Sequence, residues 1–203
     1  MSGRDVSTLK VGITGGIGTG KTLVCKVFST LAIPIYNADS RAKWLMNNDT
    51  NLKSNIVQLI GKEAYNKQDN LDSKFIASIV LKDETLLQKL NQLVHPKVGE
   101  DFENWVSMQF HVPFVLKEAA LLFEAGSYKL LDYVITVTSP LELRIKRIQL
   151  RDPFRSVDQI KEIIKNQWSE EQKIRLSDEV IINDETMLLI PQILKVYRQL
   201  LAK

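Results

Sequence analysis

The feature that most constrains this chain is a glycine-rich stretch that directly follows a short apolar run. Residues 9–14 (LKVGIT) are typical of a buried strand, and residues 15–22 (GGIGTGKT) match the pattern G-x-x-x-x-G-K-[ST] in full. Because glycine has no Cβ, the backbone can curl and point several N–H groups into one concavity. A helix that begins near Lys21 adds its positive N-terminal end. The stretch predicts a site for the phosphates of a nucleoside triphosphate and favours ATP.

Individual residues of this phosphate loop, residues 15–22, have separate expected roles. The Lys21 side chain can reach the β- and γ-phosphates, and the Thr22 hydroxyl can join the ligand shell of a Mg²⁺ ion. The remaining residues expected to hold the nucleotide are Gly15, Gly16, Ile17, Gly18, Thr19 and Gly20. The alternative is a glycine-rich turn that binds nothing, and the strand–turn–helix context of the full motif argues against it.

Short apolar stretches separated by helical patterns predict an α/β fold. The expected strands are residues 9–14, 33–36, 112–116, 133–137 and 180–182. Strands that alternate with helices imply βαβ units, and therefore a parallel five-stranded sheet with helices on both faces. We assign the nucleotide-binding core to residues 1–40, 101–139 and 179–203, and two helical excursions to residues 41–100 and 140–178.

Composition excludes several classes of protein. The 203 residues suffice for one substantial core with small appended lobes. The single cysteine, Cys25, rules out an internal disulfide and a cysteine-rich metal site, and it fits a reducing compartment. We find no secretory signal and no apolar run of the roughly 18 residues that span a bilayer. A net charge of +3 does not indicate nucleic-acid binding. We expect a cytoplasmic protein, monomeric or weakly homo-oligomeric, that acts on a small molecule.

Asp39 follows the second expected strand and is a candidate catalytic base. The carboxyl ends of neighbouring strands in an open α/β sheet gather at one crevice, so we expect Asp39 to face the phosphate held by Lys21. An ionised aspartate can accept a proton from a substrate hydroxyl, and phosphoryl transfer needs only a weak base. The alternative is that Asp39 caps a helix that begins at Ser40. The position alone leaves both interpretations open.

Three arginines form a second constellation. The spacings of three and four residues between Arg144, Arg147 and Arg151 place all three on one face of a helix. Such a face could close on the triphosphate and spread the charge of the transferred phosphoryl group. The alternative is a solvated basic stripe.

Six segments along the chain form a recognisable series: VGITGGIGTGKT, IPIYNAD, LNQLVHP, LLFEAG, RIKRIQLRD and SDEVIIND. Their order and spacing resemble those of the dephospho-coenzyme A kinases. The resemblance implies ATP-dependent phosphorylation of the ribose 3′-hydroxyl of dephospho-coenzyme A, the last step of coenzyme A synthesis. It further implies that residues 41–100 form the acceptor-binding lobe and residues 140–178 a mobile lid.

The same resemblance implies roles for individual residues. Asp39 matches the family's base, and Arg147 and Arg151 match its lid arginines. Asn183, at the end of the fifth expected strand, would lie near the adenine of ATP. Leu23 takes the place of a threonine common at that point of the family's pattern, which affects one contact to the α-phosphate.

Three other positions have more than one interpretation. Asn37 stands where the family often has a second acid, so Asp39 would act as the only carboxylate, with Asn37 donating a hydrogen bond. Glu118 could bind Mg²⁺ through water, or pair with Lys117 at the crevice. His95 could anchor a helix break before the proline that follows it, or touch the acceptor substrate.

Other functions remain as alternatives. The chain could be another P-loop kinase, acting on a nucleoside monophosphate or a small metabolite, or a nucleotide-binding switch without a phosphorylated product. Residues 66–69 spell N-K-Q-D, which in GTPases recognises guanine, but no buried strand precedes them and the chain has no D-x-x-G. We therefore expect residues 66–69 to be an ordinary loop.

Overall fold

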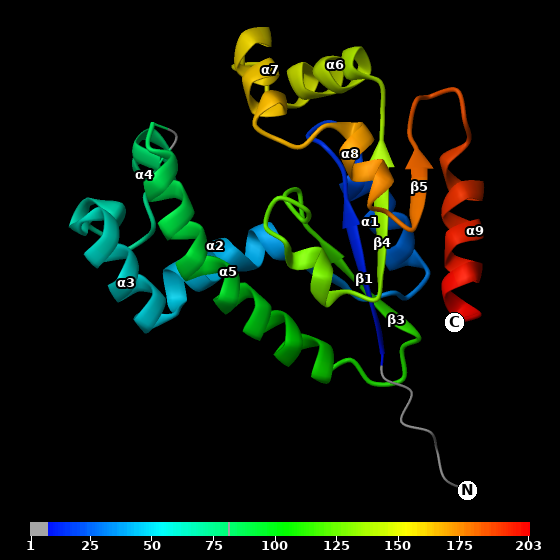
Figure 1. Ribbon diagram of the computed structural model, residues 1–203, viewed down its shortest axis with the longest axis horizontal. Coiled ribbons are helices and arrows are strands. Elements are labelled where there is room, and N and C mark those ends of the chain that lie inside the picture. Colours follow the sequence, from blue (N-terminus) through cyan, green and yellow to red (C-terminus); the bar gives the residue numbers. More distant parts are fainter. Residues whose placement is uncertain (1–7, 81) are drawn as a thin grey trace, which may run out of the picture. The chain divides into compact units, whose positions relative to one another are not determined.

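A parallel sheet organises the larger of two structural units. The computed structural model describes residues 8–80 and 82–203, and in that part of the chain the sheet has five strands in the order β2-β3-β1-β4-β5 (Figure 1). The strands are β1 (Leu9–Thr14), β2 (Ile35–Asn37), β3 (Phe114–Glu118), β4 (Tyr133–Thr138) and β5 (Glu179–Ile182). In the centre, Ile13 of β1 lies opposite Glu118 of β3 and Ile135 of β4 in parallel register. The expected fold class is confirmed.

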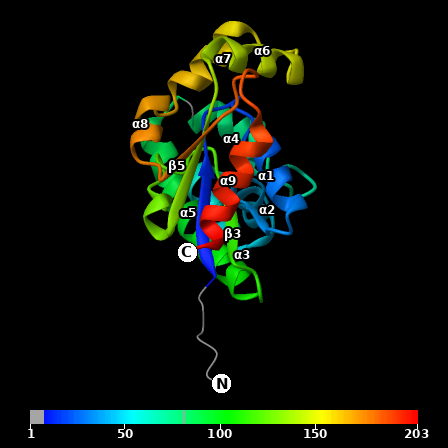
Figure 2. The ribbon, with the colours of Figure 1, turned by 90° about the vertical axis from the view of Figure 1, so that its right-hand side faces the viewer.

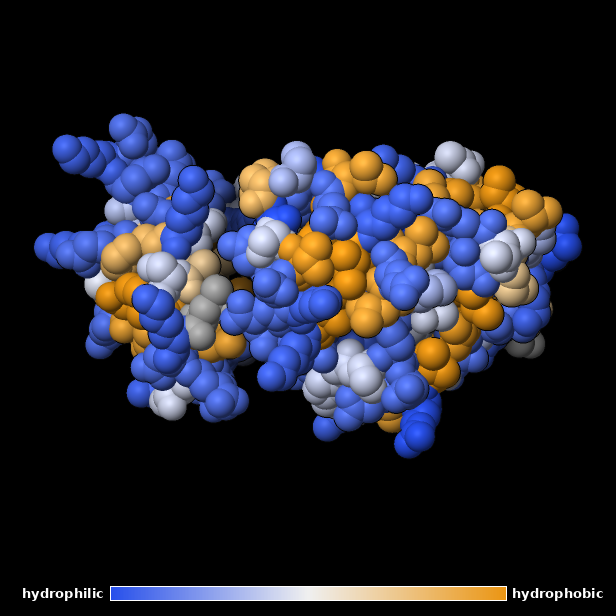
Figure 3. Space-filling view, turned by 90° about the horizontal axis from the view of Figure 1, so that it is seen from above, coloured by the Kyte–Doolittle hydropathy of each residue, from blue (hydrophilic) through white to orange (hydrophobic). Residues whose placement is uncertain are grey.

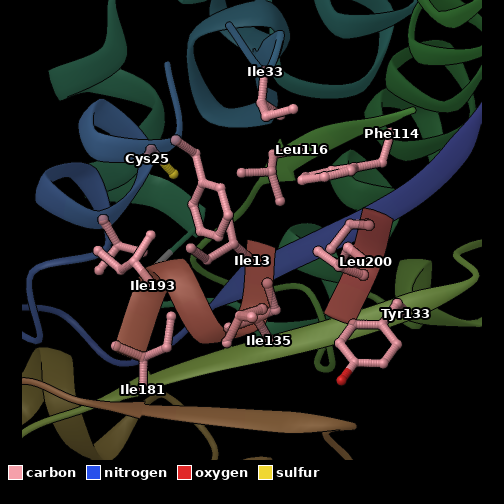
Figure 4. Close-up of a cluster of buried hydrophobic side chains, with 14 of the residues drawn as sticks. Ile13, Cys25, Ile33, Phe114, Leu116, Tyr133, Ile135, Ile181, Ile193 and Leu200 are labelled. Atoms are coloured by element: carbon pink, nitrogen blue, oxygen red, sulfur yellow. The ribbon is translucent and has the colours of Figure 1, made fainter. Parts of the chain in front are cut away.

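Two helices cover one face of this sheet. Helix α1 (Lys21–Thr30) follows the phosphate loop, and helix α9 (Leu189–Leu201) ends the chain. Their buried side chains pack against the alternate residues of the strands that face them (Figure 4). Phe28 of α1 meets Phe114 of β3 edge-on, with ring centroids 6.2 Å apart. Full burial of one such side chain contributes about 1.5–3 kcal/mol, so this layer anchors the loop that precedes α1.

The opposite face of the sheet is covered by the segment after β3 and by helix α8 (Glu170–Arg175). Figure 2 shows α1 and α9 on one side of β1 and α8 on the other. A Cβ on Gly12 would lie 2.6 Å from a methyl of Leu131 and 2.8 Å from a methyl of Leu122. The glycine at this position of β1 therefore lets the covering segment, which includes the 3-10 turn η2 (Ser127–Leu130), pack closely on the sheet.

Two aspartates lock neighbouring strands together at equivalent places. Asp132, directly before β4, accepts a hydrogen bond from the backbone N–H of Lys10 at 2.7 Å. Asp178, directly before β5, accepts one from the backbone N–H of Val134 at 2.8 Å. In both cases the aspartate's own N–H donates to the carbonyl of the same partner residue. An aspartate before a short apolar run thus fixes the register of the following strand.

Three helices lie between β4 and β5, in the segment expected to be the lid. They are α6 (Leu141–Arg151), α7 (Val157–Lys165) and α8, and all three lie within the expected helical excursion of residues 140–178. The Asp152-Pro153 pair ends α6, because proline disfavours helix in the residue before it. Ser156 and Ser169 cap α7 and α8, each in a capping box with the glutamine three residues later. Seen from the side on which α6 and α7 lie, hydrophobic residues form several small groups between hydrophilic ones (Figure 3).

The second unit, Asn37–Ser107, is helical. It contains α2 (Ala38–Asn48), α3 (Thr50–Ile60), the 3-10 turn η1 (Lys62–Ala64), α4 (Ser73–Val80) and α5 (Glu84–Ser107). The N-K-Q-D segment lies in a turn closed by an antiparallel bridge between Tyr65 and Leu71. The side-chain oxygen Oδ1 of Asn66 is used inside this turn, where it accepts from the backbone N–H groups of Gln68 and Asn70. Residues 66–69 are therefore an ordinary loop, as expected.

Several element boundaries differ from the sequence-based expectations; β2, for example, spans Ile35–Asn37 instead of residues 33–36. β3 begins at Phe114 instead of residue 112, since Pro113 has no N–H with which to join the ladder. α9 begins only at Leu189, because Asp184 closes a turn after β5 by accepting from the N–H groups of Thr186 and Met187. α5 continues through Pro96 without a break, so the helix break expected at His95 is wrong.

Asn37 determines where α2 begins. Its side chain accepts a hydrogen bond of 2.8 Å from the backbone N–H of Ser40, and its own backbone is extended. The helix therefore starts at Ala38, and Asp39 lies inside the first turn. The alternative in which Asp39 caps a helix from Ser40 is wrong.

We expect Asn37→Ala to lower the free energy of unfolding by about 1 kcal/mol, because the substitution removes this cap acceptor. Asn37→Asp is the matched control: it keeps a cap oxygen and should stay close to the wild-type value. Urea denaturation followed by circular dichroism measures both. Equal stability of the alanine variant and the wild type would contradict the capping role.

Candidate active site

The phosphate loop is folded around the side chain of its own lysine. The Lys21 ammonium donates to the carbonyl oxygen of Gly15 at 2.7 Å and to that of Gly16 at 3.3 Å. The Thr19 hydroxyl also donates to the Gly16 carbonyl, at 2.9 Å. Gly15, Gly18 and Gly20 all have positive φ angles, which only glycine adopts without strain. The loop thus has the concave form that the motif predicts, and Lys21 lies at its centre.

A hydroxyl and a carboxylate meet beside this loop. The Thr22 hydroxyl donates a 2.9 Å hydrogen bond to Oε1 of Glu118, the last residue of β3. The Glu118 side chain is buried, and the parallel pairing of β1 and β3 brings it next to the start of α1. This contact places Glu118 at what we call the metal corner, the Thr22–Glu118 pair beside the phosphate loop. The role of Glu118 toward Mg²⁺ stays a prediction.

The residues at this corner fit Mg²⁺. Mg²⁺ prefers hard oxygen ligands and usually keeps several waters, with one or two carboxylates and the substrate phosphates completing the shell. Thr22 and Glu118 offer one hydroxyl and one carboxylate. Among residues 8–80 and 82–203, no group of three or more His, Cys, Asp or Glu side chains could hold a metal ion by itself. The site is therefore of the type in which the nucleotide brings much of the ligand set.

Cys25 lies behind the metal corner, and its thiol is unreactive. It is 4% exposed, and burial, followed by the nearby charge of Glu118, raises the pKa of its thiol. The thiol therefore stays protonated and packs as a small apolar group, as expected from the sequence.

Asn183 ties the end of β5 to the phosphate loop. Its amide nitrogen donates 2.8 Å to the carbonyl oxygen of Thr19, and the side chain is buried. A Cβ on Gly20 would overlap the Asn183 amide, so glycine at position 20 leaves room for this contact. Asn183 thus supports the loop directly. The expectation that Asn183 lies near adenine did not include this contact with Thr19.

Arg147 is held on the same strand end. Its guanidinium donates to the Ser139 hydroxyl and to the Asn183 carbonyl oxygen, each at 3.1 Å, and pairs with Glu185. Arg151, one turn further along α6, pairs with Asp152 and is well exposed. A hydrogen bond from Arg151 lowers the pKa of the Asp152 carboxyl. In this structure the two arginines therefore contact residues outside the phosphate loop.

Arg144 is the member of the arginine group that contacts the phosphate loop. Its Nε donates to the carbonyl oxygen of Ile17 at 2.9 Å, and its Nη1 donates to Glu170 at 3.2 Å. The side chain is 4% exposed, and this burial lowers the pKa of its guanidinium. The solvated-stripe interpretation is therefore wrong for Arg144. The sequence carried a signal, since Arg144 shares the buried face of α6 with Ile148 four residues later.

Two glycines of the loop are required by Arg144. A Cβ on Gly16 would overlap the Arg144 guanidinium, and a Cβ on Gly18 would lie 2.7 Å from its carbonyl oxygen. At these two positions the absence of a side chain lets α6 approach the loop.

The remaining predicted site residues have simple settings. Leu23 is half exposed, and its N–H donates to the carbonyl of Gly20, inside the first turn of α1. Asp39 is exposed in the first turn of α2, and His95 is exposed on α5. The catalytic role of Asp39 and the acceptor-binding role of His95 stay predictions.

Comparison with known proteins identifies the family. The chain matches the family model described as dephospho-CoA kinase over residues 9–188. A dephospho-CoA kinase of Bacteroides fragilis (strain YCH46) is 34% identical over 195 residues, which are 96% of this chain and 94% of that protein. The chain belongs to the dephospho-CoA kinase family. The family and the enzyme class expected from the sequence, a phosphotransferase, are confirmed.

Two solved structures share the fold of this chain. The crystal structure of TT1252 from Thermus thermophilus has a TM-score of 0.83 at 27% identity, covering 96% of this chain and 97% of that one. A dephospho-CoA kinase from Campylobacter jejuni has a TM-score of 0.69 at 24% identity, covering 95% and 97%. The second likeness shows the fold alone. No helix within the described residues has the length and hydropathy to span a membrane.

We expect Gly18→Ala to destabilise the protein, because it combines a φ of 84° with the overlap on Arg144. The left-handed conformation alone costs a non-glycine residue roughly 1–2 kcal/mol. Gly99→Ala is the control: it lies inside α5, and an added Cβ there meets nothing within 4 Å. Thermal unfolding should show a lower midpoint for the first variant and an unchanged or higher midpoint for the second. Equal midpoints for the two variants would contradict the steric argument.

Proposed function

We propose that this protein transfers the γ-phosphoryl group of ATP to the ribose 3′-hydroxyl of dephospho-CoA, giving CoA and ADP. The observation that carries the proposal is the cluster of Lys21, Thr22 and Glu118 at the phosphate loop, in a chain of the dephospho-CoA kinase family. In this cluster, Lys21 supplies a positive charge for the phosphates, and Thr22 and Glu118 supply oxygen ligands for a metal ion. Phosphoryl transfer requires both.

The ATP side of the reaction uses the main chain of the loop and the N-terminus of α1. Backbone N–H groups of the loop and the start of α1 bind the phosphates, and Lys21 contacts the β- and γ-phosphates. Thr22 and, directly or through water, Glu118 would hold Mg²⁺. When bound, Mg²⁺ supplies neutralisation of the charge on the phosphate oxygens.

The acceptor side uses the helical unit. Asp39 takes the proton of the attacking 3′-hydroxyl, so that the new O–P bond forms as the bond to the β-phosphate oxygen breaks. Its exposure and its place in the first turn of α2 support this role, because the helix N-terminus favours a negative charge. His95, which is also exposed, contacts the dephospho-CoA.

The segment of residues 140–178 acts as a lid. A kinase must keep water from the γ-phosphate, or ATP is hydrolysed without a product. On closure, Arg147 and Arg151 move from Asn183 and Asp152 to the phosphates, where their charge stabilises the transition state. Asn183 stays on the phosphate loop and lies toward the adenine.

The direct test is the acceptor dependence of ADP release. Dephospho-CoA should stimulate ADP release from ATP, whereas AMP, CMP and shikimate should not. Mass spectrometry of the product should locate the new phosphate on the ribose 3′-oxygen. Stimulation by AMP, CMP or shikimate instead would replace the proposed acceptor with another one.

We expect Asp39→Asn to keep ATP affinity and lower kcat by about 10²–10⁴-fold, the usual contribution of a general base. Asp49→Asn is the control, since it removes the same charge from the same unit while asparagine still caps α3. Steady-state kinetics with dephospho-CoA measure both. An unchanged kcat in the Asp39 variant would remove it from the mechanism.

We expect Lys21→Ala to weaken ATP binding and to lower kcat together, because the side chain contacts the phosphates in both the ground state and the transition state. Lys26→Ala, an exposed lysine on the same helix, should change neither. Calorimetric titration with a non-hydrolysable ATP analogue gives the affinity. Wild-type affinity in the Lys21 variant would count against the phosphate cradle.

A further inference from the structure

Both backbone groups of one phosphate-loop residue are bound by side chains from the lid. The Ile17 N–H donates to Oε1 of Gln167 at 2.9 Å, and the Ile17 carbonyl accepts from Nε of Arg144 at 2.9 Å. The neighbouring N–H of Gly16 donates to Oε1 of Glu170 at 3.3 Å. The first half of the loop is therefore hydrogen-bonded to residues more than 120 positions away in the sequence.

These three side chains form one neutral cluster, the loop clasp (Arg144, Gln167 and Glu170). Glu170 pairs with Arg144 through the same oxygen that accepts from Gly16, so its charge is balanced where it meets the loop. Gly16 is buried, and a buried N–H without an acceptor is costly. Within the clasp, Glu170 and Gln167 supply the acceptors for the N–H groups of Gly16 and Ile17.

Gln167 and Glu170, the two clasp residues nearest to β5 in the sequence, lie in a segment that is anchored to the residues following β3. Lys173, which is fully buried, pairs with Glu124 at 2.9 Å. The same Glu124 oxygen accepts from the backbone N–H of Trp168, whose ring stacks on Phe123 with an interplanar angle of 4°. A buried ion pair is costly to break from one side, so residues 167–173 are fixed to the segment that follows β3.

The position of the clasp separates it from the phosphates. It takes the N–H groups of Gly16 and Ile17, whereas the helix N-terminus that favours an anion begins at Lys21. In the second half of the loop, the Thr19 N–H donates to the Gly16 carbonyl oxygen at 3.3 Å, and none of the three clasp side chains bonds to the start of α1. ATP can therefore bind with the clasp in place.

We propose that Arg144, Gln167 and Glu170 are positioning residues that hold the first half of the phosphate loop in its nucleotide-binding shape from the lid side. The inference rests on the proposed function for its meaning in catalysis, because it assigns these residues to the ATP step. It also limits the moving part of the lid to the segment between Arg144 and Gln167, which contains most of α6 and all of α7.

The test compares substitutions that keep or remove the acceptor oxygen. Glu170→Gln keeps an acceptor oxygen for the Gly16 N–H, whereas Glu170→Met removes it with a side chain of similar size. Gln167→Met likewise removes the acceptor of the Ile17 N–H. Glu171→Met is the matched control, because Glu171 is the exposed next residue of α8. For each variant we would measure ADP affinity by calorimetric titration, KM for ATP and for dephospho-CoA, kcat, and the thermal midpoint.

We expect Glu170→Met and Gln167→Met to weaken ADP binding and raise KM for ATP by roughly tenfold, the size of one lost hydrogen bond with a charged or buried partner. KM for dephospho-CoA should stay unchanged. Glu170→Gln should recover most of the ADP affinity, and Glu171→Met should match the wild type.

Three outcomes would overturn the proposal. Unchanged ADP affinity with a lower thermal midpoint would make the cluster a stability feature only. Tighter ADP binding by Glu170→Met would mean that its carboxylate competes with phosphate. Equal loss in Glu170→Gln and Glu170→Met would remove the acceptor argument. Because ADP titration needs no acceptor substrate, a wild-type protein that fails to phosphorylate dephospho-CoA would refute the proposed function and leave this test intact.

Discussion

Hydrogen bonds between distant side chains and the main chain of the phosphate loop are the interactions on which the rest of the site depends. A loop that turns through φ angles of 145°, 84° and 95° at three glycines cannot satisfy its own backbone as a helix or strand would. Its carbonyls are bound by Lys21 from within, by Asn183 from β5 and by Arg144 from α6. Each of those side chains is positioned by an element that the parallel sheet brings to the same edge.

The sheet order makes this convergence possible. β1 lies between β3 and β4, so the loop that follows β1 is flanked by the carboxyl ends of both neighbours. β3 ends on Glu118, which reaches Thr22, and β4 leads into α6 and Arg144. The aspartates before β4 and β5 fix the register of β4 against β1 and of β5 against β4, and therefore the positions of the residues that follow these two strands. Charge placement at the site is thus a consequence of strand register.

The features that the sequence predicted well are formed by neighbouring residues. Most of those that it missed depend on contacts between distant parts of the chain. The phosphate loop, β1 and α1 could be predicted because a strand, a glycine turn and a helix follow one another directly. The break expected at His95 was wrong because buried side chains on both sides of Pro96, including Val94 and Val98, hold α5 together despite one lost N–H.

The loop clasp could not be predicted as a whole. Arg144 shared a buried helix face with Ile148, which is a usable signal. Gln167 showed none, and Glu170 signalled only the start of a helix, because their contacts with residues 16 and 17 join parts of the chain about 150 positions apart. The role expected for Asp39 came from its position after a strand and from the resemblance, and that of His95 came from the resemblance; both remain predictions.

The protonated thiol of Cys25 has a consequence for how such an enzyme would respond to oxidative stress. Peroxides and disulfides react with thiolates, and a thiol buried beside a carboxylate offers almost none at neutral pH. The only sulfhydryl of the chain sits one turn behind the metal corner, yet it would not register the redox state of its surroundings. Alkylation of that sulfur would instead report the opening of α1 from the sheet.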